Sequence, residues 1–139
     1  MKVLFDTNVL LDVFLKREPF FEASAQAIGL AEKGEIEGWI CGTTVTTIFY
    51  LLSRELSAKK ANKHVREILK IFNVSNINRV VLEDALDSNF KDYEDAVLYQ
   101  SAVHANLGAI VTRNQKDFIK SELPVYNPAV FLEVLDSLE

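Results

Sequence analysis

Short hydrophobic runs alternate along the chain with longer segments in which apolar and polar positions recur at helical spacing. The short runs are rich in Val, Ile, Leu and Phe and are bounded by polar residues, a pattern typical of buried strands. The predicted strands are Lys2–Phe5, Trp39–Cys41, Val74–Ile77, Ala109–Val111 and Leu123–Tyr126. The predicted helices are Asn8–Leu15, Phe20–Lys33, a segment from Thr43 or Thr44 to about Leu56, Lys59–Phe72, Arg79–Asp87, Asp92–Leu107 and a last one that begins at Asn127–Pro128.

Strands that alternate with helices are typical of a parallel sheet covered by helices on both faces. The pattern therefore predicts an α/β fold. At 139 residues the chain has the length of one domain, and it contains no linker, repeat or low-complexity stretch. We expect a single domain that spans residues 1–139.

The overall charge is acidic, with 20 Asp and Glu against 15 Lys and Arg and a net charge of -5. This balance argues against a protein that coats nucleic acid in bulk, because such proteins gain affinity by neutralising phosphates. It does not exclude an enzyme that acts on nucleic acid, since a few carboxylates can hold cations that reverse the local charge. The single cysteine, Cys41, excludes an internal disulfide and a zinc site built from several cysteines.

No segment predicts a leader peptide or a membrane span. The N-terminus lacks a basic region followed by a long apolar stretch, because Asp6 interrupts it early. The longest uncharged run, Gly38–Ser53, has 16 residues, four of them threonine. It falls short of the roughly 18 apolar residues that a spanning helix needs. We therefore expect a cytoplasmic protein with no membrane partner.

Asp6 stands directly after the first predicted strand. Ligands of parallel α/β sheets bind outside the carboxyl ends of the strands, and Thr7 and Asn8 add small polar side chains beside this carboxylate. Asp6 is therefore placed either to hold a hard cation or to cap the helix that follows. The spacing alone leaves both interpretations open.

A second group of acids opens the helix predicted from Asp92. Residues three apart share a helix face, so we expect Asp92 and Asp95 to point together while Glu94 turns aside. The structural alternative is that Asp92 caps the helix and that the positive helix end favours Asp95. The stretch from Leu82 to Asp95 holds six acids and one base, and such crowding destabilises a fold unless a cation or solvent relieves it.

The third polar group follows the predicted strand Ala109–Val111. Thr112 supplies a hydroxyl, and Asn114 and Asp117 supply oxygen ligands, at the same edge of the sheet as Asp6. On its own this group is more simply interpreted as a polar loop between a strand and a helix. Together the three groups offer oxygen ligands without a nearby histidine, a donor set that suits Mg²⁺ or Mn²⁺ better than zinc.

Four short stretches occur in an order and at a spacing that resemble the PIN domain family, most closely its VapC-like toxins from toxin–antitoxin pairs. Each stretch is short, but the combination is specific and spans nearly the whole chain. The resemblance implies a three-layer α/β/α sandwich with a central parallel sheet and a Mg²⁺- or Mn²⁺-dependent endoribonuclease that hydrolyses RNA. It also implies an antitoxin partner and a homodimer. The stretches are Phe5–Asp12, Asp92–Ala96, Thr112–Phe118 and the ending Asn127–Leu132.

The resemblance also implies roles for individual residues. Asp6 matches the first metal-binding aspartate of the family, and Asp95 matches the aspartate that opens the long helix, with Asp92 as a supporting acid. Asn114 occupies the position after Thr-Arg where the family has Asp or Asn, and Asp117 follows in the same loop. The implied catalytic residues are Asp6, Asp95, Asn114 and Asp117, the implied metal ligands are Asp6, Asp92, Asp95 and Asp117, and the supporting residues are Thr7, Asn8, Thr47 and Thr112.

One position departs from the family pattern. The family usually has an acid in the helix after the second strand, where this chain has Thr47. Glu55 is eight residues further, about 12 Å along a helix, and cannot simply substitute. This leaves open a weakened or inactive PIN module that binds RNA or a protein partner. A phosphoryl-transfer domain with Asp6 as nucleophile is a further alternative, which Asn8 disfavours because a second aspartate is expected there.

The helix predicted over Lys59–Phe72 divides into an apolar and a basic side. The stretch from Arg54 to Lys70 carries six bases against two acids. The basic side is either a solvated face, an antitoxin contact or a surface that binds RNA phosphates without reading sequence. The apolar side comprises Ala61, Val65, Ile68, Leu69 and Phe72, and the candidate RNA-binding residues are Lys59, Lys63, Arg66 and Lys70.

Overall fold

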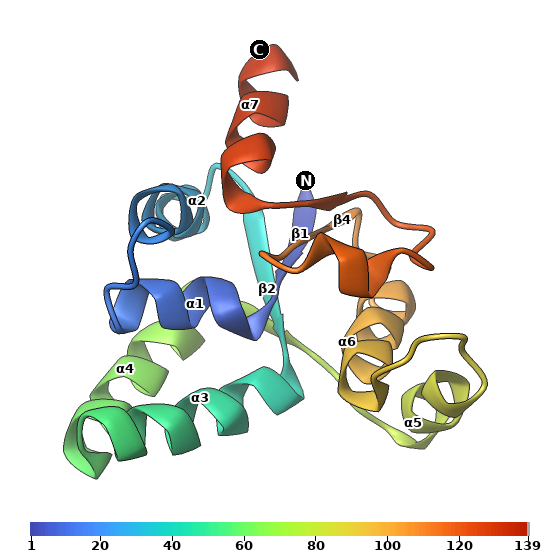
Figure 1. The fold of residues 1–139 in the computed structure, drawn as a ribbon, viewed down its shortest axis with the longest axis horizontal. Coiled ribbons are helices and arrows are strands. Elements are labelled where there is room, and N and C mark those ends of the chain that lie inside the picture. The colour runs from blue at the N-terminus through green and yellow to red at the C-terminus, as the bar shows by residue number, and fades with distance from the viewer. Residues whose placement is uncertain (139) are drawn as a thin grey trace.

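The computed structural model describes residues 1–138, and Glu139, the last residue of the expected domain, lies outside the described part. A sheet of five parallel strands in the order β3-β2-β1-β4-β5 forms its centre (Figure 1). The first strand of the chain is therefore flanked by strands on both sides. The strands are β1 (Lys2–Phe5), β2 (Glu37–Cys41), β3 (Asn73–Ser75), β4 (Ala109–Val111) and β5 (Val125–Tyr126).

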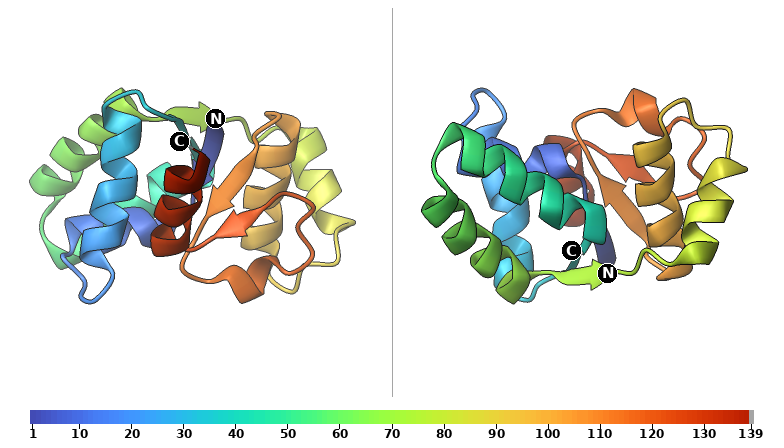
Figure 2. Two further views of the ribbon diagram at one scale, coloured as in Figure 1. Left: turned by 90° about the horizontal axis from the view of Figure 1, so that it is seen from above. Right: turned by 90° about the horizontal axis from the view of Figure 1, so that it is seen from below.

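Helices cover both faces of the sheet. Figure 2 shows α1 to α4 on one side of the strands and α5 and α6 on the other, and α7 packs against α2 and β5. The predicted α/β fold and its three-layer α/β/α arrangement are confirmed. The helices are α1 (Thr7–Phe14), α2 (Phe21–Glu32), α3 (Gly42–Glu55), α4 (Ala58–Ile71), α5 (Arg79–Leu86), α6 (Tyr93–His104), α7 (Pro128–Leu138) and the short 3-10 helix η1 (Gln115–Phe118).

The central strand β1 packs against both helical layers. Successive side chains of a strand point to opposite faces. Val3 and Phe5 enter the core shared with α1–α4 and α7, and Leu4 enters the core shared with α6. Phe5 packs edge-on against Phe72 and Phe131, with ring centroids 5.3 and 6.4 Å apart. These contacts fix the end of α4 and the start of α7 to the sheet.

The start of α3 differs from the prediction. The helix begins at Gly42 and has no side-chain cap, so neither Thr43 nor Thr44 caps it. Thr43 Oγ1 lies 3.2 Å from Sγ of Cys41, whereas Thr44 is buried and bonds a hydroxyl on another element. The Thr43 hydroxyl therefore makes a local contact, and the Thr44 hydroxyl makes a tertiary contact that the sequence pattern cannot reveal. The other element boundaries differ from the predicted ones by up to three residues.

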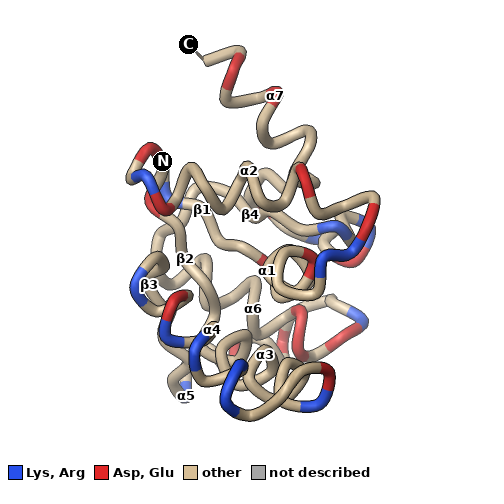
Figure 3. Tube along the Cα trace, turned by 90° about the vertical axis from the view of Figure 1, so that its left-hand side faces the viewer, with Lys and Arg blue, Asp and Glu red and all other residues tan. Residues whose placement is uncertain are grey.

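The two faces of α4 are present as predicted, with one exception. Ala61, Ile68 and the following Phe72 are buried, and Val65 is half-buried. Leu69, predicted on the apolar side, is 49% exposed, because a residue next to Ile68 is rotated about 100° around the helix. The basic residues recur along the outer side of the helix (Figure 3), and all four are exposed: Lys59, Lys63, Arg66 and Lys70.

Within residues 1–138, no helix is both long enough and apolar enough to cross a membrane.

Candidate active site

The register of two neighbouring strands holds Asp6 at the carboxyl edge of the sheet. Phe5 of β1 pairs with Val111 of β4, so Asp6 and Thr112 follow side by side. The Asp6 amide donates to the Val111 carbonyl at 2.9 Å, and the Thr112 hydroxyl donates to Asp6 Oδ2 at 2.7 Å. Asp6 Oδ1 accepts from the Thr7 amide, also at 2.7 Å. The carboxylate therefore caps α1 while it stands at the edge where ligands are expected.

Polar side chains beside Asp6 connect the start of α1 to α3 and to the segment after β4. Thr7 Oγ1 lies 2.9 Å from Thr44 Oγ1 of α3. Asn8 Nδ2 lies 3.4 Å from both Asp6 Oδ2 and Thr112 Oγ1. The Oδ1 atom of Asn8 accepts a hydrogen bond from the backbone amide of Arg113 at 3.3 Å. The structure thus brings the predicted supporting residues Thr7, Asn8 and Thr112 together. Thr44 joins them, although the sequence pattern suggests only that it could begin a helix.

The second group of acids lies at the N-terminus of α6. Asp92 is the N-cap, and its Oδ1 accepts from the Asp95 amide at 3.1 Å. Glu94 and Asp95 occupy the first turn, where the positive end of the helix dipole favours acids. The capping interpretation of Asp92 is therefore confirmed. This cap uses the backbone amide of Asp95, so capping does not involve the Asp95 carboxylate.

Burial changes the protonation of Asp6. Loss of solvent raises the pKa of this carboxyl. The hydroxyl of Thr112 and the amide of Thr7 lower the pKa in part, whereas the charges of Glu94 and Asp117 raise it further. Because only 8% of Asp6 is exposed, water relieves little of this charge, and a nearby cation would stabilise the ionised form.

Partial burial and four neighbouring acids raise the pKa of Asp95 to about 7. Burial makes the largest contribution, and the contributing acids, in order of effect, are Asp6, Asp92, Asp117 and Glu94. Glu94 therefore acts on this group electrostatically, although helical spacing predicted that it turns aside. A cluster of acids that repel one another is a site that a cation would stabilise.

Asp95 and Asp117 line one pocket of about 450 Å³, together with Asp92. Asn114 is not brought into it: the residue is exposed, and its backbone amide donates to Thr112 Oγ1 at 3.1 Å. A larger cavity of about 780 Å³ lies between α2 and α7 and contains none of these acids. The remaining walls of the acidic pocket are Asn89, Phe90, Lys91, Lys116, Ile119 and Lys120.

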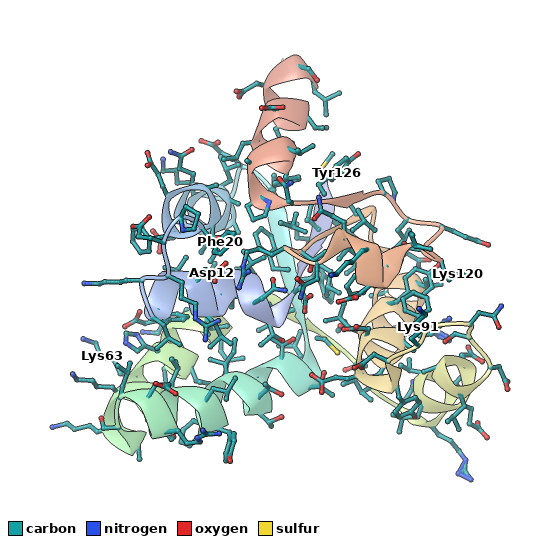
Figure 4. All side chains as sticks on the ribbon, viewed as in Figure 1. Asp12, Phe20, Lys63, Lys91, Lys120 and Tyr126 are labelled. Atoms are coloured by element: carbon teal, nitrogen blue, oxygen red, sulfur yellow. The ribbon has the colours of Figure 1, made fainter. Side chains whose placement is uncertain are left out.

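A buried ion pair braces the loop that follows β4. Arg113 Nε donates to Asp12 Oδ2 at 2.5 Å, and the Asp12 side chain is fully buried. The guanidinium lies over the Phe20 ring, 4.0 Å from its centroid, and Asp12 and Phe20 lie close together in Figure 4. No local pattern in the sequence predicts this pair, because its members are 101 positions apart.

Thr47 lies half-buried in α3, one turn beyond Thr44. The helix contains one acid, Glu55, at its far end, so α3 does not replace the missing carboxylate.

The basic residues of α4 also lie apart from the acids. None of the four lines the pocket of Asp95, and Lys63 points outward, away from the sheet, in Figure 4. The assignment of RNA to this face stays a prediction.

The chemistry of the site fits a hard divalent cation. Asp6, Asp95 and Asp117 offer carboxylate oxygens, and their mutual repulsion is relieved by positive charge. Within the part of the chain that the structure describes, no three His, Cys, Asp or Glu side chains converge to enclose one ion. The donor atoms are therefore of the kind that Mg²⁺ and Mn²⁺ prefer, although the described side chains do not form a closed ligand set.

Known proteins share both the sequence pattern and the fold. A family model described as PIN domain matches residues 2–116. The chain is 29% identical to Ribonuclease VapC1 of Aquifex aeolicus (strain VF5) over 142 residues, which cover 99% of this chain and 97% of that protein.

Two solved structures have the same architecture. A toxin–antitoxin complex from Klebsiella pneumoniae matches with a TM-score of 0.68 and 28% identity, over 91% of this chain and 97% of the matched chain. VapBC2 from Rickettsia felis, bound to a DNA fragment from its promoter, matches with a TM-score of 0.70 and 15% identity, over 91% of this chain and 98% of the matched chain. At that lower identity, the second match supports the fold alone.

Proposed function

The chain belongs to the PIN domain family, and on that premise we propose that it is a metal-dependent endoribonuclease, the toxin of a type II toxin–antitoxin pair. The observation that carries this proposal is the group of mutually repelling carboxylates at the carboxyl edge of the sheet, Asp6, Asp95 and Asp117. The relative from Aquifex aeolicus, which is similar over nearly its full length, is named a ribonuclease.

Phosphodiester hydrolysis needs an activated water and stabilisation of the charge that develops on the phosphate. Mg²⁺ or Mn²⁺ held by Asp6, Asp95 and Asp117, with Asp92 as a supporting acid, would polarise the phosphate and lower the pKa of a water molecule. The chain prepares this arrangement through Thr112, whose hydroxyl orients Asp6 by donating to Oδ2. We assign Asp117, in η1, to orienting water and substrate, and Asn114, exposed outside the pocket in the loop after β4, to contacting the substrate.

Cleavage of a panel of RNAs by the purified protein in Mn²⁺ tests the proposal. We expect cleavage that EDTA abolishes and that Asp95→Asn removes. Asp84→Asn is a matched control, because Asp84 pairs with His104 at 2.8 Å and does not line the acidic pocket. The proposal fails when the native protein leaves every RNA intact under conditions in which a related ribonuclease cuts them.

Thr47 favours the second candidate function, a PIN module that binds RNA or protein without cleaving. The Thr47→Asp variant distinguishes the nuclease from the binding module, because it restores an acid at the position where this chain departs from the family pattern. If the native chain is a nuclease, we expect it to cleave without this change. If neither protein cleaves and both bind RNA with an affinity that EDTA leaves unchanged, the binding module is the correct interpretation.

We also propose an antitoxin partner, on the ground that a similar solved structure is a toxin–antitoxin complex. We propose a homodimer as well, which the resemblance to the family implies. Phe49 and Tyr50 of α3 are 37% and 59% exposed and are candidates for such contacts. Light scattering on the native protein and on Phe49→Ser/Tyr50→Ser tests the dimer. We expect twice the chain mass for the native protein and a monomer for the variant, and a native monomer contradicts the proposal.

A further inference from the structure

The acidic pocket has a rim of lysines. Lys91 comes from the loop before α6, Lys116 from η1 and Lys120 from the segment after η1, so the three approach the pocket from two separate parts of the chain. Figure 4 shows Lys91 and Lys120 on the same side of the molecule, and Lys63 of α4 on the other. These lysines therefore line the same pocket as the acids, whereas the basic residues of α4 do not.

The charges of these lysines are free to meet a ligand. All three are exposed, and none forms an ion pair with a described residue, although Asp92, Asp95 and Asp117 line the same pocket. A polyanion that approaches a group of carboxylates is repelled unless positive charge lies beside its path. The rim supplies that charge at the place where an RNA would have to enter.

An exposed apolar side chain lines the same pocket as the lysines. Ile119, between Lys116 and Lys120 in sequence, lines the pocket and is 78% exposed, more than any other large hydrophobic side chain in the described part. Phe90 forms a wall of the pocket but is already stacked on Tyr99, with centroids 5.0 Å apart. Ile119 is therefore the apolar surface of this pocket that remains open to a ligand.

We propose that Lys91, Lys116 and Lys120 bind the phosphates that flank the cleaved bond of a single-stranded RNA, and that Ile119 packs against one of its bases. Proteins commonly hold single strands in a cationic groove with side chains, usually aromatic, against which the unpaired bases pack, and Ile119 offers an aliphatic surface in that place. This inference rests on the proposed ribonuclease function, and it assigns the substrate to the rim rather than to α4.

The test compares three triple variants with equal loss of charge. The rim variant is Lys91→Gln/Lys116→Gln/Lys120→Gln, and the α4 variant is Lys59→Gln/Lys63→Gln/Lys70→Gln. The control is Lys2→Gln/Lys16→Gln/Lys33→Gln, three exposed lysines that line neither the acidic pocket nor α4. Each triple is measured for cleavage, and again in an Asp95→Asn background for affinity to a fluorescent single-stranded RNA over a series of salt concentrations.

We expect the rim variant to reduce the slope of log affinity against log salt by about 2, because each lost contact with a single strand contributes about 0.7. At 0.1 M salt this corresponds to roughly 100-fold weaker binding, with a matching rise in KM. Ile119→Ser should weaken binding about fivefold with an unchanged salt slope, since an apolar contact releases no counterions.

Two outcomes overturn the inference. In one, the rim variant keeps the salt slope of the control. In the other, the α4 variant loses the slope and the rim variant does not. Failure of the proposed function is distinguishable from both, because it appears as a native protein that cleaves no RNA, whereas the salt slope is measured without cleavage.

Discussion

Two buried aspartates lie six residues apart, Asp6 at the N-cap of α1 and Asp12 within the helix, and the charges around them differ in sign. Asp12 is fully buried and pairs with the guanidinium of Arg113. Asp6 is nearly as buried, yet its partners are a hydroxyl and a backbone amide, and its charged neighbours are other acids. Both are held by adjacent residues of the loop after β4, since Thr112 bonds the first and Arg113 the second.

We interpret this difference as one between a charge that stabilises the fold and a charge that is available to a ligand. The carboxylate of Asp12 is neutralised within the fold, and no charge is left to bind a ligand. The carboxylate of Asp6 is held by dipoles that leave its charge uncompensated, at an edge where Asp95 and Asp117 add to it. We infer that the chain keeps one aspartate for rigidity and the other for a cation.

The largest expected effect comes from Asp6→Asn. We expect RNA cleavage to fall about 1,000-fold, because a metal site contributes several kcal/mol to the transition state and each 1.36 kcal/mol is tenfold in rate. The thermal midpoint of the metal-free variant should stay equal to that of the native protein or rise, since the change removes a buried charge surrounded by acids. Full activity in Asp6→Asn would show that the Asp6 carboxylate does not hold the metal, and the functional distinction between Asp6 and Asp12 would be wrong.

The matched change at the other end of α1, Asp12→Asn, should reduce stability instead. It leaves the partly buried guanidinium of Arg113 without a counter-charge, and we expect a loss of about 3 kcal/mol in the free energy of unfolding. Urea unfolding measures it. The double variant Asp12→Leu/Arg113→Met should recover most of the loss, because a neutral apolar pair leaves no buried charge. A stable Asp12→Asn protein would contradict the structural role.

Thr112→Val tests whether the segment after β4, which contacts both aspartates, holds Asp6 through the Thr112 hydroxyl. The change removes the donor to Asp6 Oδ2 and the acceptor of the Asn114 amide. We expect a loss of about 2 kcal/mol in stability, the usual range for a hydrogen bond to a charged group. Thr112→Ser keeps the hydroxyl and is the control, expected within about 1 kcal/mol of the native protein. Equal stability of the two variants would show that the hydroxyl does not hold Asp6.

The smallest effect, and the only gain, is expected from Asp95→Asn in metal-free protein. The pKa of Asp95 is raised from 3.8 to about 7 in the folded state, so its contribution to stability is full below pH 4 and is lost as the pH rises through 7. The Asp95→Asn variant does not lose stability in this way, because the Asn side chain does not ionise. At pH 8 we expect it to be more stable by about 1 kcal/mol, after the solvent screening of a half-exposed carboxylate.

Urea unfolding of the native protein and of Asp95→Asn between pH 4 and 8, in EDTA, measures this dependence. The two curves should meet at pH 4 and separate as the pH rises. A native protein whose stability does not fall over this range would show that the acids do not repel one another. Addition of Mn²⁺ should then stabilise the native protein more than the variant, because only the native site keeps every carboxylate.

Much of the architecture follows from local pattern. The strands Lys2–Phe5 and Ala109–Val111 have the bounds that their apolar runs predict, and Asp92 caps its helix as its position before the helix indicates. These features depend on burial periodicity and on capping, both of which involve residues close in sequence. The start of α3 differs, because Thr44, a predicted cap, is buried against Thr7 of another element.

By itself the sequence determined the order of strands and helices, the acids at the strand ends and the resemblance to one family. Only the tertiary structure decided which of these residues meet. The register of β1 with β4 places Thr112 on Asp6, and the return of the loop after β4 places Arg113 on Asp12. It also decided that lysines rim the acidic pocket while the basic face of α4 points elsewhere. The physical reason is that such contacts join residues far apart in sequence, and local periodicity carries no record of them.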